Sequence, residues 1–393
     1  MGARVKVACV GGGPASLYFS ILMKCVDPSH EVTVYERNPA GSTYGWGVTY
    51  WDELIQNLIA ADSDSARTIA EESVRWDAWV VHVHERMTVT VDHADDGYGI
   101  GRRRLLDILT ERARALGVNV EFEREIAGEA EVADADLIVA GDGVNSVLRE
   151  RHADHFGSQI AVGRNTYLWL GTTQVFKAFT FAYTETEHGW IWCYGYPYSG
   201  EHSTCVVECS PETWRGLGFH EANEADCLAR LEKFFADILD GNPLIGRGQP
   251  DGDPHWLNFR TLTNRRWFRD NLVLMGDAAH TTHYSIGAGT ALALGDAATL
   301  AKALHLGLPL PRALARYERE CKSAIRGTQK AALYSARWYE NLPRYIDHPP
   351  RDLITLIGQR HSPLMARIPP RLYCGLDHVT GRLAALLPRR RRR

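Results

Sequence analysis

The apolar and polar positions near the N-terminus follow a strand, turn, helix, strand pattern. Residues 5–10 form a short apolar, β-branched-rich run, which is typical of a buried parallel strand. The apolar positions of residues 17–25 favour a helix packed on a sheet, and residues 31–35 predict a second strand. Turn residues join the first strand to the helix: Gly11, Gly12, Gly13, Pro14, Ala15 and Ser16. This stretch predicts a βαβ unit of an α/β fold.

The same alternation of helical and strand patterns returns in two later parts of the chain. Helices are predicted over residues 52–74, 102–116, 221–239 and 312–341, with a further long helix from residue 287 onward. Buried strands are predicted over residues 118–122, 135–140 and 271–275. Pro343 should end the last of these helices, because proline cannot continue a helical hydrogen-bond ladder.

Between residues 160 and 208 the pattern changes to aromatic and β-branched runs without helical interruption. These runs predict antiparallel strands of a separate sheet, and residues 79–92 predict two more strands joined near Glu85 and Arg86. We therefore expect a Rossmann-like dinucleotide-binding domain beside an antiparallel-sheet substrate domain. The expected domain ranges are 1–155 with 260–345 for the first and 156–259 for the second, with 75–98 contributing to the second, then a C-terminal helical region 346–388 and a disordered arginine tail 389–393.

The glycine turn has the chemistry of a dinucleotide site. Gly11 allows the tight turn, and Gly13 lets the backbone approach a pyrophosphate at the helix N-terminus. Glu36, 20 positions after Ser16, can accept hydrogen bonds from an adenosine ribose. Ser16 stands where such turns carry a third glycine, so slightly wider helix packing is expected without loss of binding. A glycine-rich turn in an ordinary α/β protein is the alternative.

Charge and cysteine usage narrow the class of protein. The net charge is −4, and without residues 389–393 the chain carries 39 basic against 48 acidic residues. This balance does not favour a nucleic-acid partner.

The eight cysteines are scattered and match no metal-site spacing, so we expect reduced cysteines, a cytoplasmic protein and no metal site. No run approaches the ~20 apolar residues of a membrane span, and no signal peptide is expected.

Two more motifs follow predicted strands. One is the segment DGVNSVLR, which begins at Asp142, and the other is GDAAH, which begins at Gly276 and is followed by Gly287, Ala288 and Gly289. A flavin dinucleotide is long enough to need several such motifs. An aspartate at a strand end can bind its ribityl hydroxyls, and N–H groups at a helix start can face the pyrimidine side of its ring.

These motifs carry a family resemblance. In the order GGGPAS, DGxxSxxR and GDAAH, the chain resembles the FAD-dependent aromatic hydroxylases with a single FAD domain. The segments GWGVTYWDELIQNL, GIGRRRLLDIL, WLNFRTLTNRRW and GDAAHTTHYSIGAGT resemble the branch that contains salicylyl-CoA 5-hydroxylase and anthraniloyl-CoA monooxygenase, with the violacein-pathway tryptophan hydroxylase as a more distant relative. The resemblance runs from about residue 5 to 345.

The resemblance implies a monooxygenase in which NADH or NADPH reduces FAD and O2 supplies one oxygen atom to an electron-rich ring. The implied FAD-binding residues are Gly11, Gly13, Pro14, Ala15, Ser16, Glu36, Arg37, Val48, Arg102, Asp142, Asp277, Gly287, Ala288 and Gly289. The fork of Arg102 can pair with a pyrophosphate, unless it is a surface arginine in a run of three. His280 is interpreted as a structural histidine bonded to backbone.

The family places substrate near His283 and Tyr284, which are the predicted catalytic residues, although both could only shape the pocket. Trp46, Tyr50, Trp192 and Tyr194 are predicted to line the substrate site, and their alternative is plain aromatic core. The substrate is an aromatic small molecule, either free or carried as a thioester, and the protein is expected to be a monomer or homodimer. A halogenase is disfavoured, because the Trp190-Ile191-Trp192 segment lacks the Ile-Pro of the halogenase signature. A hydroxylase of a free aromatic or indole, a non-hydroxylating flavoprotein and an FAD-stabilised scaffold are further alternatives.

Overall fold

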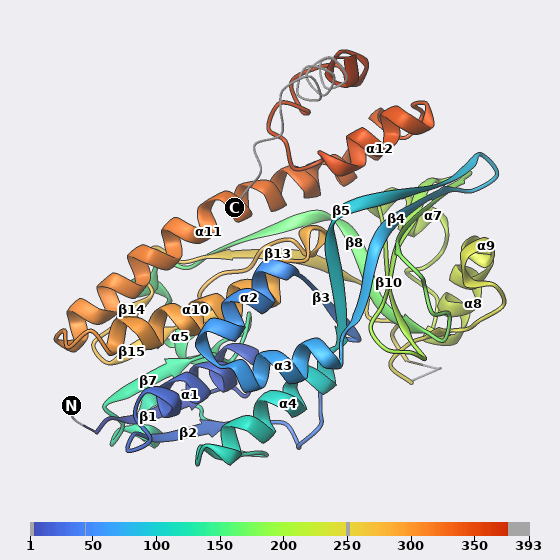
Figure 1. The fold of residues 1–393 in the computed structure, drawn as a ribbon. Coiled ribbons are helices and arrows are strands. Elements are labelled where there is room, and N and C mark those ends of the chain that lie inside the picture. Colours follow the sequence, from blue (N-terminus) through green and yellow to red (C-terminus); the bar gives the residue numbers. More distant parts are fainter. Residues whose placement is uncertain (1–3, 44, 249–251, 376–393) are drawn as a thin grey trace.

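The computed structural model describes residues 4–43, 45–248 and 252–375. Two β-sheets form the body of the molecule, and helices cover them (Figure 1). Within the described residues the smaller sheet has six strands and is mainly parallel, whereas the larger sheet has nine and is mainly antiparallel. The predicted fold class, a Rossmann-like unit beside an antiparallel sheet, is confirmed.

The smaller sheet is the Rossmann-like unit. Its strands are β1 (Lys6–Val10), β2 (Glu31–Tyr35), β6 (Asn119–Glu121), β7 (Leu137–Ala140), β14 (Phe268–Arg269) and β15 (Leu272–Leu274), in the spatial order β14-β15-β7-β1-β2-β6. All pairs are parallel except β14 with β15. The carboxyl ends of β1, β7 and β15 therefore meet at one edge, and each is followed by one of the three sequence motifs.

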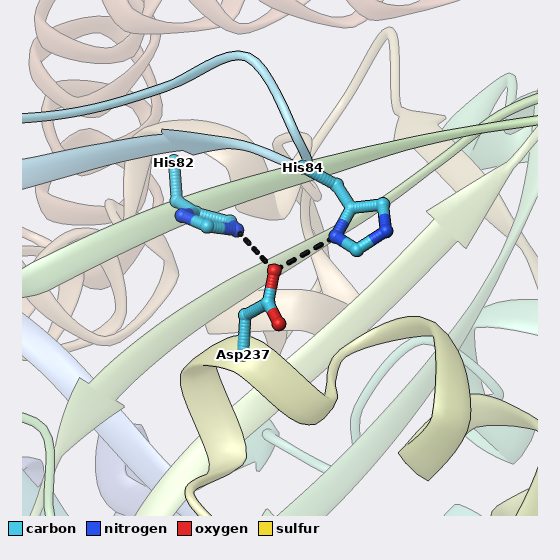
Figure 2. Close-up of side chains that lie close together, drawn as sticks. All are labelled: His82, His84 and Asp237. Atoms are coloured by element: carbon cyan, nitrogen blue, oxygen red, sulfur yellow. Dashed lines mark hydrogen bonds and ion pairs between the residues drawn. The ribbon is translucent and has the colours of Figure 1, made fainter.

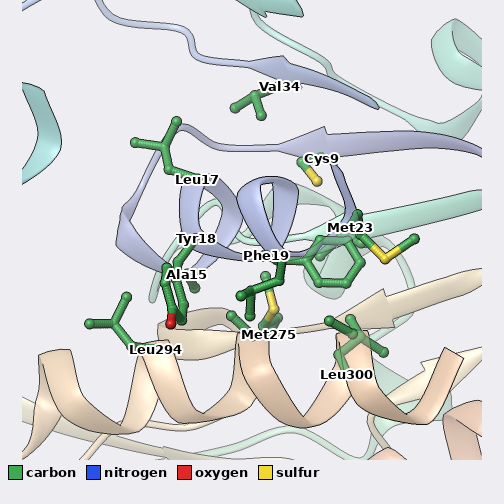
Figure 3. Close-up of a cluster of buried hydrophobic side chains, with 14 of the residues drawn as sticks. Cys9, Ala15, Leu17, Tyr18, Phe19, Met23, Val34, Met275, Leu294 and Leu300 are labelled. Atoms are coloured by element: carbon green, nitrogen blue, oxygen red, sulfur yellow. The ribbon is translucent and has the colours of Figure 1, made fainter. Parts of the chain in front are cut away.

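Helix α1 (Pro14–Val26) lies between this sheet and α10 (Gly289–Leu304), as Figure 3 shows. Leu17 and Phe19 of α1 belong to the same buried cluster as Met275 and Leu294. A fully buried side chain of this size contributes about 1.5–3 kcal/mol. This packing holds the start of α1 and the start of α10 in a common layer, beside the strand ends.

The remaining helices of this half are α2 (Asp52–Ala61), α3 (Ser63–Glu71), α4 (Arg102–Ala115), α5 (Val147–Arg151) and α6 (Ala153–Phe156), with the 3₁₀ helix η1 (Glu129–Val132). The single helix predicted over residues 52–74 is broken at Asp62. The Asp62 carboxylate accepts a hydrogen bond from the backbone N–H of Ser65 at 3.2 Å and one from Arg112 at 2.7 Å. A side chain that caps a helix start in this way ends one helix and begins the next.

The larger sheet contains β3 (Gly47–Trp51), β4 (Val74–Val83), β5 (Met87–Gly101), β8 (Gln159–Thr172), β9 (Phe179–Thr186), β10 (Gly189–Pro197), β11 (Ser203–Cys209), β12 (Leu244–Ile245) and β13 (Leu257–Thr263). Its order is β12-β8-β11-β10-β9-β4-β5-β3, with β13 also paired to β8. The predicted pair of strands joined near Glu85 and Arg86 is β4 and β5. Two strands differ from the expected division: β3 pairs with β5, and β13 pairs with β8 along residues beyond 259, so both extend the substrate sheet.

Helices cover both faces of the larger sheet. On one face lie α7 (Pro211–Gly216), α8 (Glu224–Phe234) and α9 (Ala236–Leu239). On the other lie α11 (Leu310–Glu340), α12 (Pro350–Gly358) and the 3₁₀ helices η3 (Tyr284–Ile286) and η4 (Leu342–Arg344), whereas the 3₁₀ helix η2 (Gly276–Ala278) follows β15 of the smaller sheet and contacts α10. In α12, Leu353 and Leu356 belong to the buried cluster that contains Trp192 and Tyr194. The expected C-terminal helical region therefore packs on the sheet, and the expected arginine tail lies outside the described residues.

No helix among the described residues combines the length and apolar character needed to cross a membrane. All eight cysteines fall in the described ranges and are free thiols. Seven are buried as expected, whereas Cys25 is exposed.

Candidate active site

Two cavities meet where β1, β7 and β15 end. The larger has a volume of about 530 Å³ and the smaller about 330 Å³. Both are lined by residues that follow those strand ends and by the start of α4: Gly13, Arg102, Gly141, Gly143, Val144, Asn145 and Asp277. An elongated ligand can therefore extend from one cavity into the other.

The glycine turn closes one end of the smaller cavity. Gly11 has φ +97°, and a Cβ at this position would lie 2.6 Å from the Cα of Asp142. The Gly12 N–H donates to Glu36 Oε2 at 2.7 Å. Gly13 lines both cavities, and the nearest atom to a Cβ there would be 3.8 Å away. Only glycine suits position 11, and position 13 leaves room for a ligand group.

Glu36 and Arg37 line the smaller cavity at the end of β2. Glu36 Oε1 accepts hydrogen bonds from the backbone and side-chain nitrogens of Asn38 at 2.9 and 2.7 Å. These bonds fix the carboxylate at the end of the strand, the position from which it can accept hydrogen bonds from a ribose.

Ser16 has a packing role in this geometry. Its side chain is fully buried and lies outside both cavities. A Cβ on Gly141 would lie 2.1 Å from Ser16 Oγ, so the serine occupies the space beside the β7 end. The neighbouring Pro14 and Ala15 line the larger cavity instead. The structure thus favours the expected helix packing role and leaves the side chain of Ser16 without access to a ligand.

Arg102 and Asp277 face the junction of the two cavities. Arg102, the first residue of α4, donates from Nε to Thr43 Oγ1 at 3.1 Å. Burial lowers the pKa of Arg102, and the Asp277 carboxylate opposes that shift. Burial likewise raises the pKa of Asp277, and Arg102 opposes it. Within the described residues no hydrogen-bond donor reaches Asp277, so its carboxylate is available to a ligand.

The DGxxSxxR motif holds the opposite wall. Asp142 Oδ2 accepts from the Val147 N–H at 2.9 Å, while Oδ1 is buried and has no partner among the described residues. Arg149 is fully buried and donates to the carbonyl of Val144 at 2.7 Å and to that of Ala278 at 3.3 Å. Arg149 therefore ties this motif to the loop that carries Asp277.

The start of α10 faces the larger cavity. Gly287, Ala288 and Gly289 line it, together with Val48 of β3. Gly287 has φ +64°, and a Cβ there would lie 2.6 Å from Thr49 Oγ1. The first N–H groups of a helix have no intrahelical partner and carry partial positive charge, so this end of the cavity suits an electron-rich ring.

These features fit FAD. The unpartnered Asp142 Oδ1 and Asp277 carboxylate, the open position at Gly13 and the two joined cavities together match a long ligand with sugar and polyol hydroxyls. Glu36 lies at the adenosine end, and the start of α10 lies at the end that suits the flavin ring.

Beyond the flavin end, the larger cavity is walled by aromatic side chains from β4, β8, β9 and β10: Trp79, Tyr167, Trp169, Phe179, Phe181, Tyr194 and Tyr196. Such a wall binds flat apolar rings and excludes water. The predicted aromatic wall of the substrate site is therefore present, although its residues differ in part from those predicted.

Of the four predicted substrate residues, the structure places only Tyr194 on the cavity wall. Tyr50 is core: it stacks on Tyr98 with ring centroids 5.3 Å apart and donates to Ser73. Trp192 is 2% exposed and lies behind Tyr194, to whose hydroxyl its Nε1 donates at 2.9 Å. The ring of Trp46 packs over Gly171, outside the cavity. Whether each of these aromatic side chains lines the cavity depends on the direction in which it points from its strand or loop. The aromatic composition of the sequence does not reveal that direction.

The two predicted catalytic residues occupy different places. Tyr284 lines the larger cavity, whereas His283 is buried behind it, with ring centroids 4.3 Å apart. His283 Nδ1 accepts from the Ser285 N–H at 3.3 Å, and burial lowers the pKa of His283 to about 3. A neutral histidine in this position orients Tyr284 and caps η3.

His280 is structural, as predicted, but its partner is a side chain and not the backbone. Its Nε2 lies 2.8 Å from Asp296 Oδ2, and its ring stacks on Trp267 at 5.1 Å. Asp296 also accepts from the Gly276 N–H at 3.0 Å. This buried group supports the loop that carries Asp277.

Glu208 was missed by the sequence analysis. It is the penultimate residue of β11, is 1% exposed, and accepts a hydrogen bond from the Tyr284 hydroxyl at 2.5 Å. Burial raises the pKa of Glu208 to about 7. The segment STCVVEC was interpreted only as a strand; a charged residue within an apolar strand was the signal that could have revealed it.

The fold and the site define a flavin dinucleotide-binding enzyme with an aromatic-lined chamber beside its cofactor cleft. Residues 4–332 match the FAD binding domain family, and the chain belongs to that family.

The relatives agree with this class. The chain is 37% identical to salicyloyl-CoA 5-hydroxylase of Streptomyces sp over 355 residues, which are 87% of this chain and 66% of that protein. It is 34% identical to 3-hydroxy-4-methyl-anthranilyl-[aryl-carrier protein] 5-monooxygenase of Streptosporangium sibiricum, over 90% of this chain and 95% of that protein. The chain thus spans just under two thirds of the Streptomyces relative's length.

Among solved structures, 2-methyl-3-hydroxypyridine-5-carboxylic acid oxygenase superposes with a TM-score of 0.70 at 18% identity, covering 87% of this chain and 92% of that one. This likeness concerns the fold. Together the family and its relatives confirm the predicted class, an FAD-dependent aromatic monooxygenase.

Proposed function

We propose that the protein uses NAD(P)H, FAD and O2 to hydroxylate an electron-rich aromatic ring that is carried as a thioester. The observation that carries the proposal is the continuity of the cavities. The two joined cavities fit FAD, and the larger one, of about 530 Å³, continues past the flavin end into a part walled by aromatic side chains. The named substrates of the two relatives support the thioester, since one is a CoA thioester and the other is bound to an aryl-carrier protein.

Some residues of this chain would bind FAD, and others would exclude water from the reacting atoms. The glycine turn and Glu36 hold the adenosine end, Arg102 compensates the pyrophosphate charge, and Asp277 binds polyol hydroxyls. Bound FAD supplies the transfer of electrons from nicotinamide to oxygen. The aromatic wall keeps water from the reacting atoms, because reactive oxygen species are otherwise lost to solvent.

A ring with a strong donor substituent is the substrate that this chemistry needs. Bound FAD together with O2 would supply an electrophilic oxygen atom, so a hydroxyl or amino group that raises the electron density of the substrate ring would speed its hydroxylation. We propose hydroxylation ortho or para to such a group.

Turnover under ¹⁸O-labelled dioxygen tests this function. The panel is salicylyl-CoA, anthraniloyl-CoA, the corresponding free acids and tryptophan, each with NADH and with NADPH. The expected product is a thioester with one ¹⁸O atom on the ring and faster NAD(P)H oxidation in its presence. Product oxygen that comes from water, or hydrogen peroxide alone with every compound, would contradict the proposal.

A further inference from the structure

Glu208 is a buried carboxylate without a cation. Its Oε2 accepts from the hydroxyls of Tyr284 at 2.5 Å and Tyr194 at 3.3 Å, and its Oε1 accepts from Asn165 Nδ2 at 2.8 Å. No Lys, Arg or His among the described residues forms an ion pair with it. Burial of a carboxylate with only neutral partners is costly, so a purely structural residue here would be better served by an amide.

The cluster faces the substrate chamber. Side chains alternate along a strand, so Glu208 points to the same side of β11 as Val206, which lines the chamber. Tyr284 and Tyr194 line it as well, whereas Glu208 does not, and both tyrosine hydroxyls donate to the Glu208 carboxylate. Any exchange between the carboxylate and a bound ligand therefore passes through a tyrosine hydroxyl.

The direction of the Tyr284 hydrogen bond defines what the chamber can recognise. Because the Tyr284 hydroxyl donates its hydrogen to Glu208, its oxygen presents lone pairs to a ligand. The Tyr194 oxygen already accepts from Trp192 Nε1 at 2.9 Å. The ligand group that matches Tyr284 is therefore a hydrogen-bond donor, such as the O–H or N–H on the substrate ring.

We propose that Tyr284 binds the ring O–H or N–H of the substrate and that Glu208, acting through Tyr284, takes up its proton. This inference rests on the proposed function and names the residues that activate the ring. In the step, the substrate O–H bond breaks as a new Tyr284 O–H forms, and the original Tyr284 proton passes to Glu208 Oε2. No electrons are transferred, and the proton returns by the same route when the product oxygen is protonated.

The surroundings of Glu208 suit reversible protonation. The ionisable groups that interact with its charge are the phenols of Tyr167, Tyr183, Tyr194, Tyr284 and Tyr339 and the thiol of Cys209, and burial raises the pKa of each. The Arg360 guanidinium lines the same chamber and lies 5.9 Å from the centroid of the Tyr339 ring. The phenols and the thiol stay neutral, so Glu208 is the group of this cluster that can change charge near neutral pH. An ionised ring oxygen is a stronger electron donor than the phenol, which links proton uptake to hydroxylation.

The test compares the FAD-loaded wild type with the FAD-loaded variants Glu208→Gln and Tyr284→Phe. The control variant is Glu187→Gln, because Glu187 is an exposed residue of the β9–β10 turn. Binding of salicylyl-CoA and of its 2-methoxybenzoyl analogue is followed by flavin absorbance from pH 6 to 9, with the phenolate band of the salicylyl ring recorded in parallel. The methoxy analogue has no proton to donate.

In wild type we expect the bound phenol to ionise at a lower pH than in either variant. Salicylyl-CoA should bind about tenfold more weakly to Glu208→Gln and Tyr284→Phe, whereas the methoxy analogue should bind all four proteins alike. Unchanged salicylyl affinity, phenolate band and pH profile in both variants would overturn the inference while leaving the proposed function intact. A wild type that makes no product with any thioester overturns both.

A second, independent cluster consists of three residues that line neither cavity. His82 of β4, His84 just beyond it and Asp237 of α9 point toward one another (Figure 2). Asp237 Oδ2 lies 2.8 Å from His84 Nδ1 and 3.4 Å from His82 Nε2, and the ligand-type atoms all lie within 4.8 Å of one another. Two imidazoles two residues apart on an extended segment share one side of it, which is why they converge.

The outer contacts of this cluster resemble those of a metal site. His82 Nδ1 lies 2.8 Å from Thr88 Oγ1, whereas the buried His82 Nε2 faces the Asp237 carboxylate at 3.4 Å without forming a hydrogen bond. A metal-binding histidine typically bonds its second ring nitrogen to an outer group, which fixes the ring.

We propose that His82 Nε2, His84 Nδ1 and the Asp237 carboxylate bind one divalent transition-metal ion of the Zn²⁺ class, with solvent as the fourth ligand. Three nitrogen and oxygen ligands plus water form a common Zn²⁺ shell. The ion would tie the β4–β5 hairpin to α9. The sequence analysis expected no metal site on the basis of the cysteine spacing, and it interpreted the segment that contains His82 and His84 only as a pair of strands.

Calorimetric titration of the FAD-loaded, tag-free protein with Zn²⁺ tests this site, with Co²⁺ absorption as a second readout. We expect one ion per chain, a tetrahedral Co²⁺ spectrum and a raised Tm. Binding should weaken by about tenfold or more in His84→Ala and Asp237→Ala, and it should be unchanged in the control His188→Ala, an exposed histidine of another turn. Absence of Zn²⁺ binding, or equal binding by wild type and the Asp237→Ala variant, would overturn the assignment.

Discussion

Arg149 donates from Nη1 to the carbonyl of Ala278 at 3.3 Å, and this bond joins two motifs that lie 129 residues apart in the sequence. Because Arg149 is fully buried and lines neither cavity, its effect on FAD is indirect. The DGxxSxxR arginine therefore serves to hold the Asp277 loop against the end of β7.

We expect Arg149→Met to lower the stability of the protein and its FAD affinity together. The substitution leaves the Val144 carbonyl without the side-chain donor that Arg149 supplies, whereas the Ala278 carbonyl keeps a hydrogen bond from Asn264 Nδ2 at 3.3 Å. An unsatisfied buried carbonyl costs about 1–3 kcal/mol. Urea unfolding and FAD titration measure the two effects. Arg151→Met is the matched control, since Arg151 lies on the same helix with 56% of its side chain exposed, and it should change neither quantity appreciably.

Asp277 and His280 should respond to substitution in opposite ways. Asp277→Asn removes a carboxylate that has no donor among the described residues, so the FAD-free protein should be as stable as wild type or slightly more so. Its FAD affinity should fall about tenfold to a hundredfold, the value of one charge-assisted hydrogen bond. His280→Ala should instead lower stability, because it removes the partner of Asp296 and the stacking on Trp267. Equal FAD affinity in Asp277→Asn and wild type would show that the carboxylate does not bind the cofactor.

The elements that repeat a simple period were predictable from sequence. The βαβ unit around Gly11, the strands β4 and β5 and the long helices follow directly from apolar spacing and glycine turns. The membership of β3 and β13 in the larger sheet was not predictable, because both strands join it through hydrogen bonds to strands distant in sequence.

Side-chain direction limited the prediction of the site. Tyr50 and Trp192 have the right chemistry for a substrate wall, yet both are buried behind other residues. Glu208 shows the converse, since it lies within an apolar run and acquires its surroundings only when β8, β10 and η3 are brought together. Tertiary contacts, which a sequence pattern does not encode locally, decide such cases.

Arg102 and its neighbour Arg103 provide a test of the pyrophosphate role. Arg102 lines both cavities, whereas the side chain of Arg103 is 71% exposed. Arg102→Met should weaken FAD binding markedly and make it less sensitive to salt, because a buried cation facing an anionic ligand is lost. Arg103 lines only the smaller cavity and its side chain is largely exposed, so Arg103→Met should weaken FAD binding much less than Arg102→Met. Similar losses in both variants, measured by fluorescence titration at two ionic strengths, would favour a general effect of surface charge.

The buried carboxylate of Glu208 should also make stability depend on pH. Its pKa is raised from the ordinary 4.5 to about 7 by burial. Between these values the unfolded chain has released the proton that the folded protein still holds, so stability falls as pH rises from about 4.5 to about 7 and is constant above that range. For a fully buried group the total change in the free energy of unfolding is about 3 kcal/mol.

Glu208→Gln cannot titrate, so its stability relative to wild type should increase by that order between pH 5 and pH 8. Urea unfolding of both FAD-loaded proteins across this range measures the difference, in which the contributions of all other groups cancel. A difference that does not vary with pH would mean that Glu208 is already ionised throughout, and that the phenols around it stabilise the carboxylate more strongly than burial disfavours it.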